Sequence, residues 1–105
     1  MKDLEGSELI LPHVPKWADP VWHLYVVRST ERDLLQKRLE DDGIGTLIHY
    51  PIAPHMQEAY AGLKISKDKL PLANQMADEI LSLPIGPQME SQQASFVCNV
   101  ICNSK

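Results

Sequence analysis

Residues 22–28 read Trp-His-Leu-Tyr-Val-Val-Arg, which is the first clear pattern of regular structure in the chain. Aromatic and β-branched residues dominate the run, which therefore predicts a β-strand. Side chains alternate between the two faces of a strand, so Leu24 and Val26 share one face, and Tyr25 and Val27 share the other. Because both faces are largely apolar, we predict that this is a central strand of its sheet.

A helix is predicted directly after this strand, up to Gly43. Thr30 is a favourable N-cap, and Asp33 follows three residues later, as in a capping box. Gly43 suits the left-handed position that ends many helices. One narrow apolar stripe marks the buried face: Leu34, Leu35 and Leu39. The charged residues of this helix are interpreted as a solvated face.

The rest of the chain is divided by its prolines and glycines. The patterns predict a second strand over residues 44–50, a short helix over 56–63, a lysine-rich loop over 64–69, a helix from Leu70-Pro71 onward, and a last helix over 91–102. The helix that begins at Leu70-Pro71 has an apolar face of Leu72, Ala73, Met76, Ala77, Ile80 and Leu81. This order predicts an α+β domain, a two-layer sandwich with helices packed on one face of a small, mainly antiparallel sheet.

The chain of 105 residues is long enough for one domain. Residues 1–21 carry Pro12, Pro15 and Pro20, which interrupt regular structure, so we expect an irregular lead-in or linker tail. The domain proper is expected over residues 22–105. Residues 9–11 within the lead-in, Leu-Ile-Leu, are a candidate short strand.

Charge and apolar patterning exclude several functional classes. The net charge of −4 and the lack of a basic stripe argue against nucleic-acid binding. No apolar run reaches the roughly 18–20 residues of a membrane helix. The first residues lack the apolar centre of a signal peptide, so we expect a cytoplasmic protein. Cys98 and Cys102 are interpreted as small apolar residues on one helix face, with no disulfide or zinc site.

The segment of residues 48–60 has the densest chemistry in the sequence. It places two histidines, two tyrosines, a glutamine and a glutamate at the end of a predicted buried strand: His49, His55, Tyr50, Tyr60, Gln57 and Glu58. Polar and aromatic side chains on a proline-stiffened loop beyond a strand end are a common way to build a binding site. The alternative is that the two tyrosines are core aromatics and the histidines brace the loop. His49 and His55 lack a third ligand, so no metal site is predicted, and no catalytic residue is assigned.

Four stretches, in register, resemble the C-terminal part of the DegT/DnrJ/StrS-type sugar aminotransferases. They are the strand from His23 to Arg28, the helix and turn from Arg32 to Thr46, the loop with His49-Tyr50-Pro51 and Pro54-His55, and the stretch from Leu72 to Pro84. The resemblance covers roughly residues 20–100. It implies the small domain of the pyridoxal-phosphate transferase fold.

The resemblance implies an enzyme that transfers an amino group from glutamate to a nucleotide-linked keto sugar, in the biosynthesis of deoxyamino sugars or surface polysaccharides. The family's cofactor lysine and its aspartate belong to the large N-terminal domain, outside this sequence. Lys64, Lys67 and Lys69 have no strand or aspartate partner and are interpreted as solvated charge. The isolated chain is therefore expected to be inactive and to form no covalent bond with pyridoxal 5′-phosphate.

The family's small domain also helps to line the sugar-nucleotide pocket near a dimer interface. Carried onto matching positions, His49 and Tyr50 are the leading substrate contacts, and His55, Gln57 and Tyr60 are second choices that could brace the loop. The expected partners are the N-terminal cofactor domain, the nucleotide sugar and a second subunit of a homodimer. Two alternatives stay open: a fragment of a related sugar dehydratase, and a standalone binding or interaction module.

Overall fold

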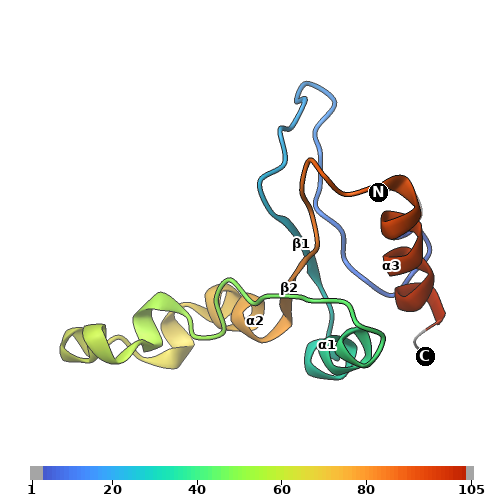
Figure 1. Cartoon of the computed structure of the whole chain (residues 1–105). Coiled ribbons are helices and arrows are strands. Elements are labelled where there is room, and N and C mark those ends of the chain that lie inside the picture. The colour runs from blue at the N-terminus through green and yellow to red at the C-terminus, as the bar shows by residue number, and fades with distance from the viewer. Residues whose placement is uncertain (1–3, 104–105) are drawn as a thin grey trace.

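The computed structural model describes residues 4–103, so the expectations for residues 1–3 and 104–105 lie outside the described residues. The regular elements are β1 (Tyr25–Arg28), α1 (Arg32–Asp41), α2 (Pro71–Glu79), β2 (Ile80–Leu83) and α3 (Ser91–Asn103). Three short 3₁₀ helices lie between α1 and α2: η2 (Pro54–Met56), η3 (Glu58–Leu63) and η4 (Lys67–Lys69). Figure 1 shows the two strands at the centre, with α1 and α3 beside them.

The sheet is small and antiparallel, as predicted. β1 pairs with β2 in a register that sets Tyr25 opposite Leu83 and Val27 opposite Leu81. An isolated bridge from Ile10 to Arg28 extends the sheet beyond β1, and a bridge from Leu47 to Ser82 extends it beyond β2. β1 therefore lies between two neighbours, as expected for a central strand. The candidate strand over residues 9–11 contributes this one bridge.

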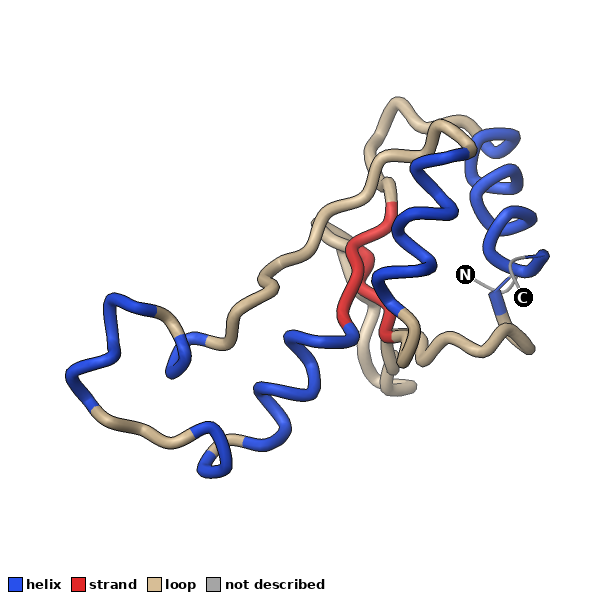
Figure 2. Tube along the Cα trace, turned by 90° about the horizontal axis from the view of Figure 1, so that it is seen from below, coloured by secondary structure: helices blue, strands red, loops and turns tan. Residues whose placement is uncertain are grey.

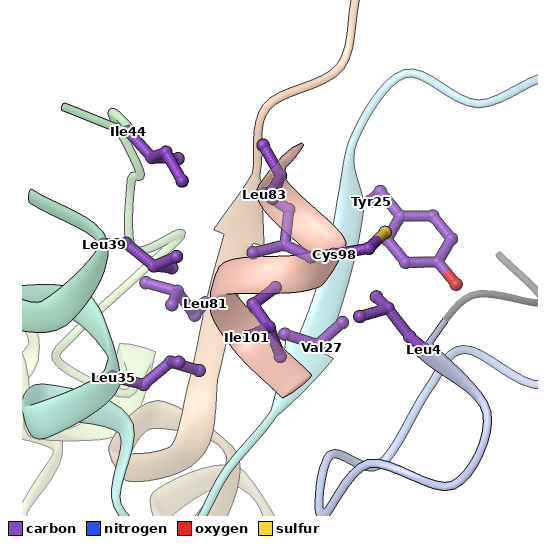
Figure 3. Packing of buried hydrophobic residues seen from close by; sticks show 11 residues of the cluster. Leu4, Tyr25, Val27, Leu35, Leu39, Ile44, Leu81, Leu83, Cys98 and Ile101 are labelled. Atoms are coloured by element: carbon purple, nitrogen blue, oxygen red, sulfur yellow. The ribbon is translucent and has the colours of Figure 1, made fainter. Parts of the chain in front are cut away.

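The two faces of the sheet differ. Tyr25, Val27, Leu81 and Leu83 share one face and belong to the core cluster. α1 and α3 supply most of the remaining members, namely Leu35, Leu39, Val97, Cys98 and Ile101, and Leu4 and Ile44 complete the cluster. Figure 3 shows α3 lying across the two strands, with the α1 side chains at one edge and Leu4 beside Tyr25 at the other. The helices thus pack on one face, which leaves the face of Val26 and Ser82 for other contacts.

One predicted strand is shorter than expected, and another does not form. The first begins at Tyr25 and not at residue 22, and Leu24 is exposed. The second, predicted over residues 44–50, is wrong as a strand, since only Leu47 pairs, with Ser82. Pro51 and Pro54 follow closely and cannot donate to a ladder, so the chain leaves the sheet after this single bridge.

The boundary between α2 and β2 was missed by sequence pattern. Ile80 and Leu81, expected on the apolar face of a helix, start a strand whose four residues are all buried. A short apolar run fits a buried strand as well as a buried helix, and pairing with β1 decides between them. Pro71 begins α2 as predicted, but Leu72 and Met76 are exposed. The predicted helix over residues 56–63 is also corrected to η2 and η3, which are tighter 3₁₀ turns.

α1 confirms the predicted helix, with corrections at its start. Glu31 is the N-cap and makes no side-chain cap bond, although the Ser29 hydroxyl accepts a hydrogen bond from the Glu31 amide at 3.1 Å. Leu34, expected in the buried stripe, is exposed. Arg32, expected on the solvated face, is buried and donates from Nη1 to the carbonyl oxygens of Ala77 at 2.9 Å and Ile80 at 3.0 Å.

α3 also confirms its prediction. Val97, Cys98 and Ile101 are buried, and Cys98 is not joined to Cys102 by a disulfide. Cys102 is exposed, so only one of the two cysteines has the expected place in the apolar face. Gly43 has a φ of +80°, the left-handed conformation expected of it after α1.

Residues 50–70 form an arm that extends away from the core. The radius of gyration is 15.5 Å, against about 13 Å expected for a compact chain of this length. Figures 1 and 2 show the three 3₁₀ helices of the arm reaching outward beyond α2. Of the residues in η3, none is buried. The arm is therefore a projection from the domain, and it carries most of the candidate site.

Candidate functional site

His49 lies where the chain leaves the sheet and enters the arm. The Leu47–Ser82 bridge places Leu47 and Ser82 on one face, and His49, two residues later, returns to the same face. There, Nδ1 of His49 lies 2.8 Å from the Ser82 hydroxyl oxygen. This is the face opposite the core cluster. The His49 ring is thus attached to the sheet by a side-chain hydrogen bond, while the backbone beyond it turns away.

Tyr50 projects beside His49 and is 68% exposed. The two rings meet edge to face, with centroids 5.4 Å apart and an interplanar angle of 79°. The peptide bond between these two residues is cis. An exposed phenol next to a half-buried imidazole offers two hydrogen-bonding groups at the base of the arm.

The other three candidates lie farther along the arm, in different settings. His55, in η2, is 7% exposed, and neither of its ring nitrogens has a hydrogen-bond partner. Gln57 donates from Nε2 to the Ile52 carbonyl oxygen at 3.3 Å, so it braces the loop. Tyr60, in η3, is exposed. The alternative in which both tyrosines are core aromatics is wrong, because Tyr50 and Tyr60 are exposed.

The structure brings together only part of the predicted site. Between residues 4 and 103, no hydrogen bond or ring contact links His49 and Tyr50 to His55, Gln57 or Tyr60. Two surface pockets, of about 450 Å³ and about 600 Å³, are lined by none of the five. The larger one lies between residues 84–89 and the start of α3. The five residues therefore share one projecting arm and its base, without enclosing a cavity of their own.

The described residues do not fit a covalent pyridoxal-phosphate site. Lys64 and Lys69 lie exposed on the arm, and Lys64 has left-handed backbone geometry with a φ of 53°. Neither pocket is lined by a lysine. No step of a cofactor reaction can be assigned to these side chains.

Residues 4–103 contain no group of three or more His, Cys, Asp or Glu side chains arranged to hold a metal ion. Among the helices of this region, none has the length and apolarity needed to cross a membrane.

Sequence reasoning missed two polar contacts near the site. One is the contact between Ser82 and His49. The sequence feature that could have indicated it is a single hydroxyl residue inside the apolar run Ile80-Leu81-Ser82-Leu83. The other is an ion pair on the site face, in which Nη2 of Arg28 donates to a Glu79 carboxylate oxygen at 2.7 Å. This pair joins the end of β1 to the end of α2, immediately before β2.

Comparisons with known proteins agree with this fold along almost the whole chain. The model of the DegT/DnrJ/EryC1/StrS aminotransferase family matches residues 1–102. The "Erythromycin biosynthesis sensory transduction protein EryC1" of Saccharopolyspora erythraea is 45% identical over 97 residues, which are 92% of this chain and 26% of that protein. The "dTDP-3-amino-3,4,6-trideoxy-alpha-D-glucose transaminase" of Streptomyces venezuelae is 45% identical over 91 residues, covering 87% of this chain and 24% of the relative.

A solved structure gives the same result in three dimensions. The crystal structure of S. venezuelae DesV in complex with a ketimine intermediate superposes with a TM-score of 0.91 at 42% identity. The match covers 95% of this chain and 27% of DesV, so the chain spans about a quarter of the length of the relatives it matches. The chain belongs to the DegT/DnrJ/EryC1/StrS aminotransferase family.

Proposed function

We propose that this chain is the C-terminal domain of a pyridoxal-phosphate-dependent aminotransferase that transfers an amino group from glutamate to a nucleotide-linked keto sugar. The observation that carries the proposal is the joint agreement in sequence and fold with DesV, 42% identity at a TM-score of 0.91. One relative is itself named as a transaminase of a dTDP-linked amino sugar. That name favours amino transfer over the dehydratase alternative.

The cofactor is assigned to another part of the full-length protein. The lysines of the arm do not fit a covalent site, and the chain spans about a quarter of its relatives. The proposal therefore places the cofactor lysine and its aspartate in an N-terminal domain, and the isolated chain is inactive. Pyridoxal phosphate bound there would supply the electron sink and the carrier for the amino group.

The exposed apolar side chains of the arm are evidence that this domain has a partner. They include Ile52, Met56, Leu63, Ile65 and Leu70. A monomer rarely leaves so many apolar groups together on one projection, so we propose that the N-terminal domain or the second subunit of a homodimer covers them. This exposure disfavours a standalone module. We also propose that the domain proper begins at residue 22, after the lead-in of residues 1–21, and that the protein is cytoplasmic.

His49 and Tyr50 are the proposed substrate contacts. Both lie at the base of the arm, and imidazole and phenol groups form hydrogen bonds with phosphate and sugar oxygens. His55, Gln57 and Tyr60 remain second candidates. Gln57 already bonds the loop backbone, so bracing accounts for its position.

Amino-transfer kinetics of the full-length protein test this function. With glutamate and a dTDP- or UDP-linked keto sugar, we expect transfer of nitrogen to the sugar, and we expect His49→Gln to raise the KM for the nucleotide sugar about tenfold. Thr46→Ser, a mild change just before the arm, is the control. Loss of water from the sugar without consumption of glutamate would instead identify a dehydratase.

A further inference from the structure

The burial of Ser82 favours one direction for its hydrogen bond with His49. Ser82 is 5% exposed, and among residues 4–103 its hydroxyl group has a hydrogen bond to Nδ1 of His49 and to no other atom. If Nδ1 carried the proton and donated, the hydroxyl proton of Ser82 would have no acceptor. An unsatisfied buried hydroxyl costs about 1–3 kcal/mol. The arrangement without this cost has the hydroxyl donating and Nδ1 accepting.

This direction of the bond implies where the neutral imidazole carries its proton. A neutral histidine carries one N–H, and when Nδ1 accepts, the proton lies on Nε2. Within the described residues, no hydrogen bond occupies Nε2 of His49, and this nitrogen is not among the buried atoms without a partner. Nε2 is therefore an accessible donor, and a ligand that meets it must supply an acceptor atom.

Contacts beside this hydrogen bond also restrict the orientation of the ring. The Ser82 amide donates to the Leu47 carbonyl oxygen at 2.7 Å, and the Leu47 amide donates to the Ser82 carbonyl oxygen at 3.3 Å. These two bonds hold the backbone on both sides of the contact, and Tyr50 packs against the ring edge to face. The imidazole is thus attached to the sheet, although the following residues belong to the projecting arm.

We propose that Ser82 is a positioning residue, which holds His49 with its proton on Nε2 as a donor to an acceptor oxygen of the nucleotide sugar. This inference rests on the proposed function, because it assumes that His49 meets that substrate. The acceptor chemistry is shared by the diphosphate and the sugar, and the test separates these two sources. Ser82 itself touches no substrate and acts only through the imidazole.

The proton position is measured first, in the 105-residue chain. In a long-range ¹H–¹⁵N correlation spectrum, with His49→Gln used for assignment, we expect a protonated Nε2 and an unprotonated Nδ1 for His49. Ser82→Ala should move the two nitrogen shifts toward each other, because both tautomers become populated. Ser82→Thr, which keeps the hydroxyl, should restore them, and Ser29→Ala serves as a control. A proton on Nδ1, or shifts unchanged in Ser82→Ala, overturns the proposal.

The substrate is tested in the full-length protein. We expect Ser82→Ala to raise the KM for the nucleotide sugar about tenfold with kcat and the KM for glutamate unchanged, and Ser82→Thr to restore it. The nucleoside diphosphate alone is then measured as an inhibitor of both proteins. If Ser82→Ala weakens its binding by the same factor, the acceptor is a phosphate oxygen. If its binding is unchanged, the acceptor belongs to the sugar.

The possible failures are distinct. A full-length protein without amino transfer to any nucleotide sugar contradicts the proposed function, whereas the spectrum still decides the Ser82–His49 contact. An active enzyme whose nucleotide-sugar KM is unchanged in Ser82→Ala contradicts the positioning role alone.

Discussion

The core half of this chain and its arm have similar side chains and opposite environments. In the core half, α1, α3 and the two strands bury a single cluster that includes Leu39, Leu81 and Val27. In the arm, Leu63 and Ile52 are more than half exposed. Burial of apolar area is the main term that stabilises a fold. The core half therefore supplies most of the folding stability of this chain, and the arm contributes little. The difference fits the proposal that the N-terminal domain or a second subunit covers the arm.

The largest difference in the free energy of unfolding should come from replacing a leucine by alanine in each region. Leu81 is 0% exposed in β2, whereas Leu63 is 65% exposed in η3. Leu81→Ala should lower the free energy of unfolding by about 2–5 kcal/mol, through lost burial and the cavity left behind. Leu63→Ala should change it by less than about 0.5 kcal/mol. Urea unfolding measures both.

Equal losses in these two variants would contradict the comparison, because they would mean that the arm is packed in solution. If Leu81→Ala abolishes cooperative unfolding, Leu81→Val provides a smaller deletion at the same site. It is expected to cost about 1 kcal/mol, which leaves the transition measurable.

Much of the core half was predictable because its signals are local. The β-branched run before Arg28, the apolar spacing of α3 and Gly43 after α1 each specify an element within a few residues. β2 was not, because Ile80 and Leu81 fit the period of the preceding helix and only pairing with β1 makes them a strand. A partner about fifty residues away in sequence leaves no local signal.

The candidate site was also predictable only where its signals are local. The density of polar and aromatic groups around His49 marked the segment, and the resemblance to the family ranked its residues. The contact with Ser82 joins residues 33 positions apart, so no spacing rule could have found it. The exposure of Leu34 and the burial of Arg32 likewise depend on how α1 lies against α2 and β2, which periodicity alone does not specify.

His55 offers a second and smaller test, within the arm itself. It is buried without a partner for either ring nitrogen, and a neutral imidazole always carries one N–H. Replacing such a group by an apolar side chain of similar shape relieves the cost of the unpaired donor. His55→Phe should therefore stabilise the isolated chain by up to about 1 kcal/mol in thermal unfolding.

His13→Phe, at an exposed position in the lead-in, is the matched control and should leave stability nearly unchanged. A destabilisation by His55→Phe would show that His55 has an acceptor in solution. If His55→Phe stabilises the chain yet impairs the full-length enzyme, then His55 is kept for a contact made outside this domain.

The smallest effect concerns the core at alkaline pH. Burial, and then the negative charge of a Cys98 thiolate, raise the pKa of Tyr25 above its ordinary value of 10.0. Above that pH, the unfolded chain loses the phenol proton while the folded chain retains it, so the unfolded state binds fewer protons and stability falls as pH rises. Below it, the contribution is fully present. Tyr25→Phe should flatten this alkaline loss in urea unfolding, whereas Tyr60→Phe, on the exposed arm, should leave it unchanged. An identical decline in wild type and Tyr25→Phe would assign the alkaline sensitivity to other groups and remove this distinction between the core and the arm.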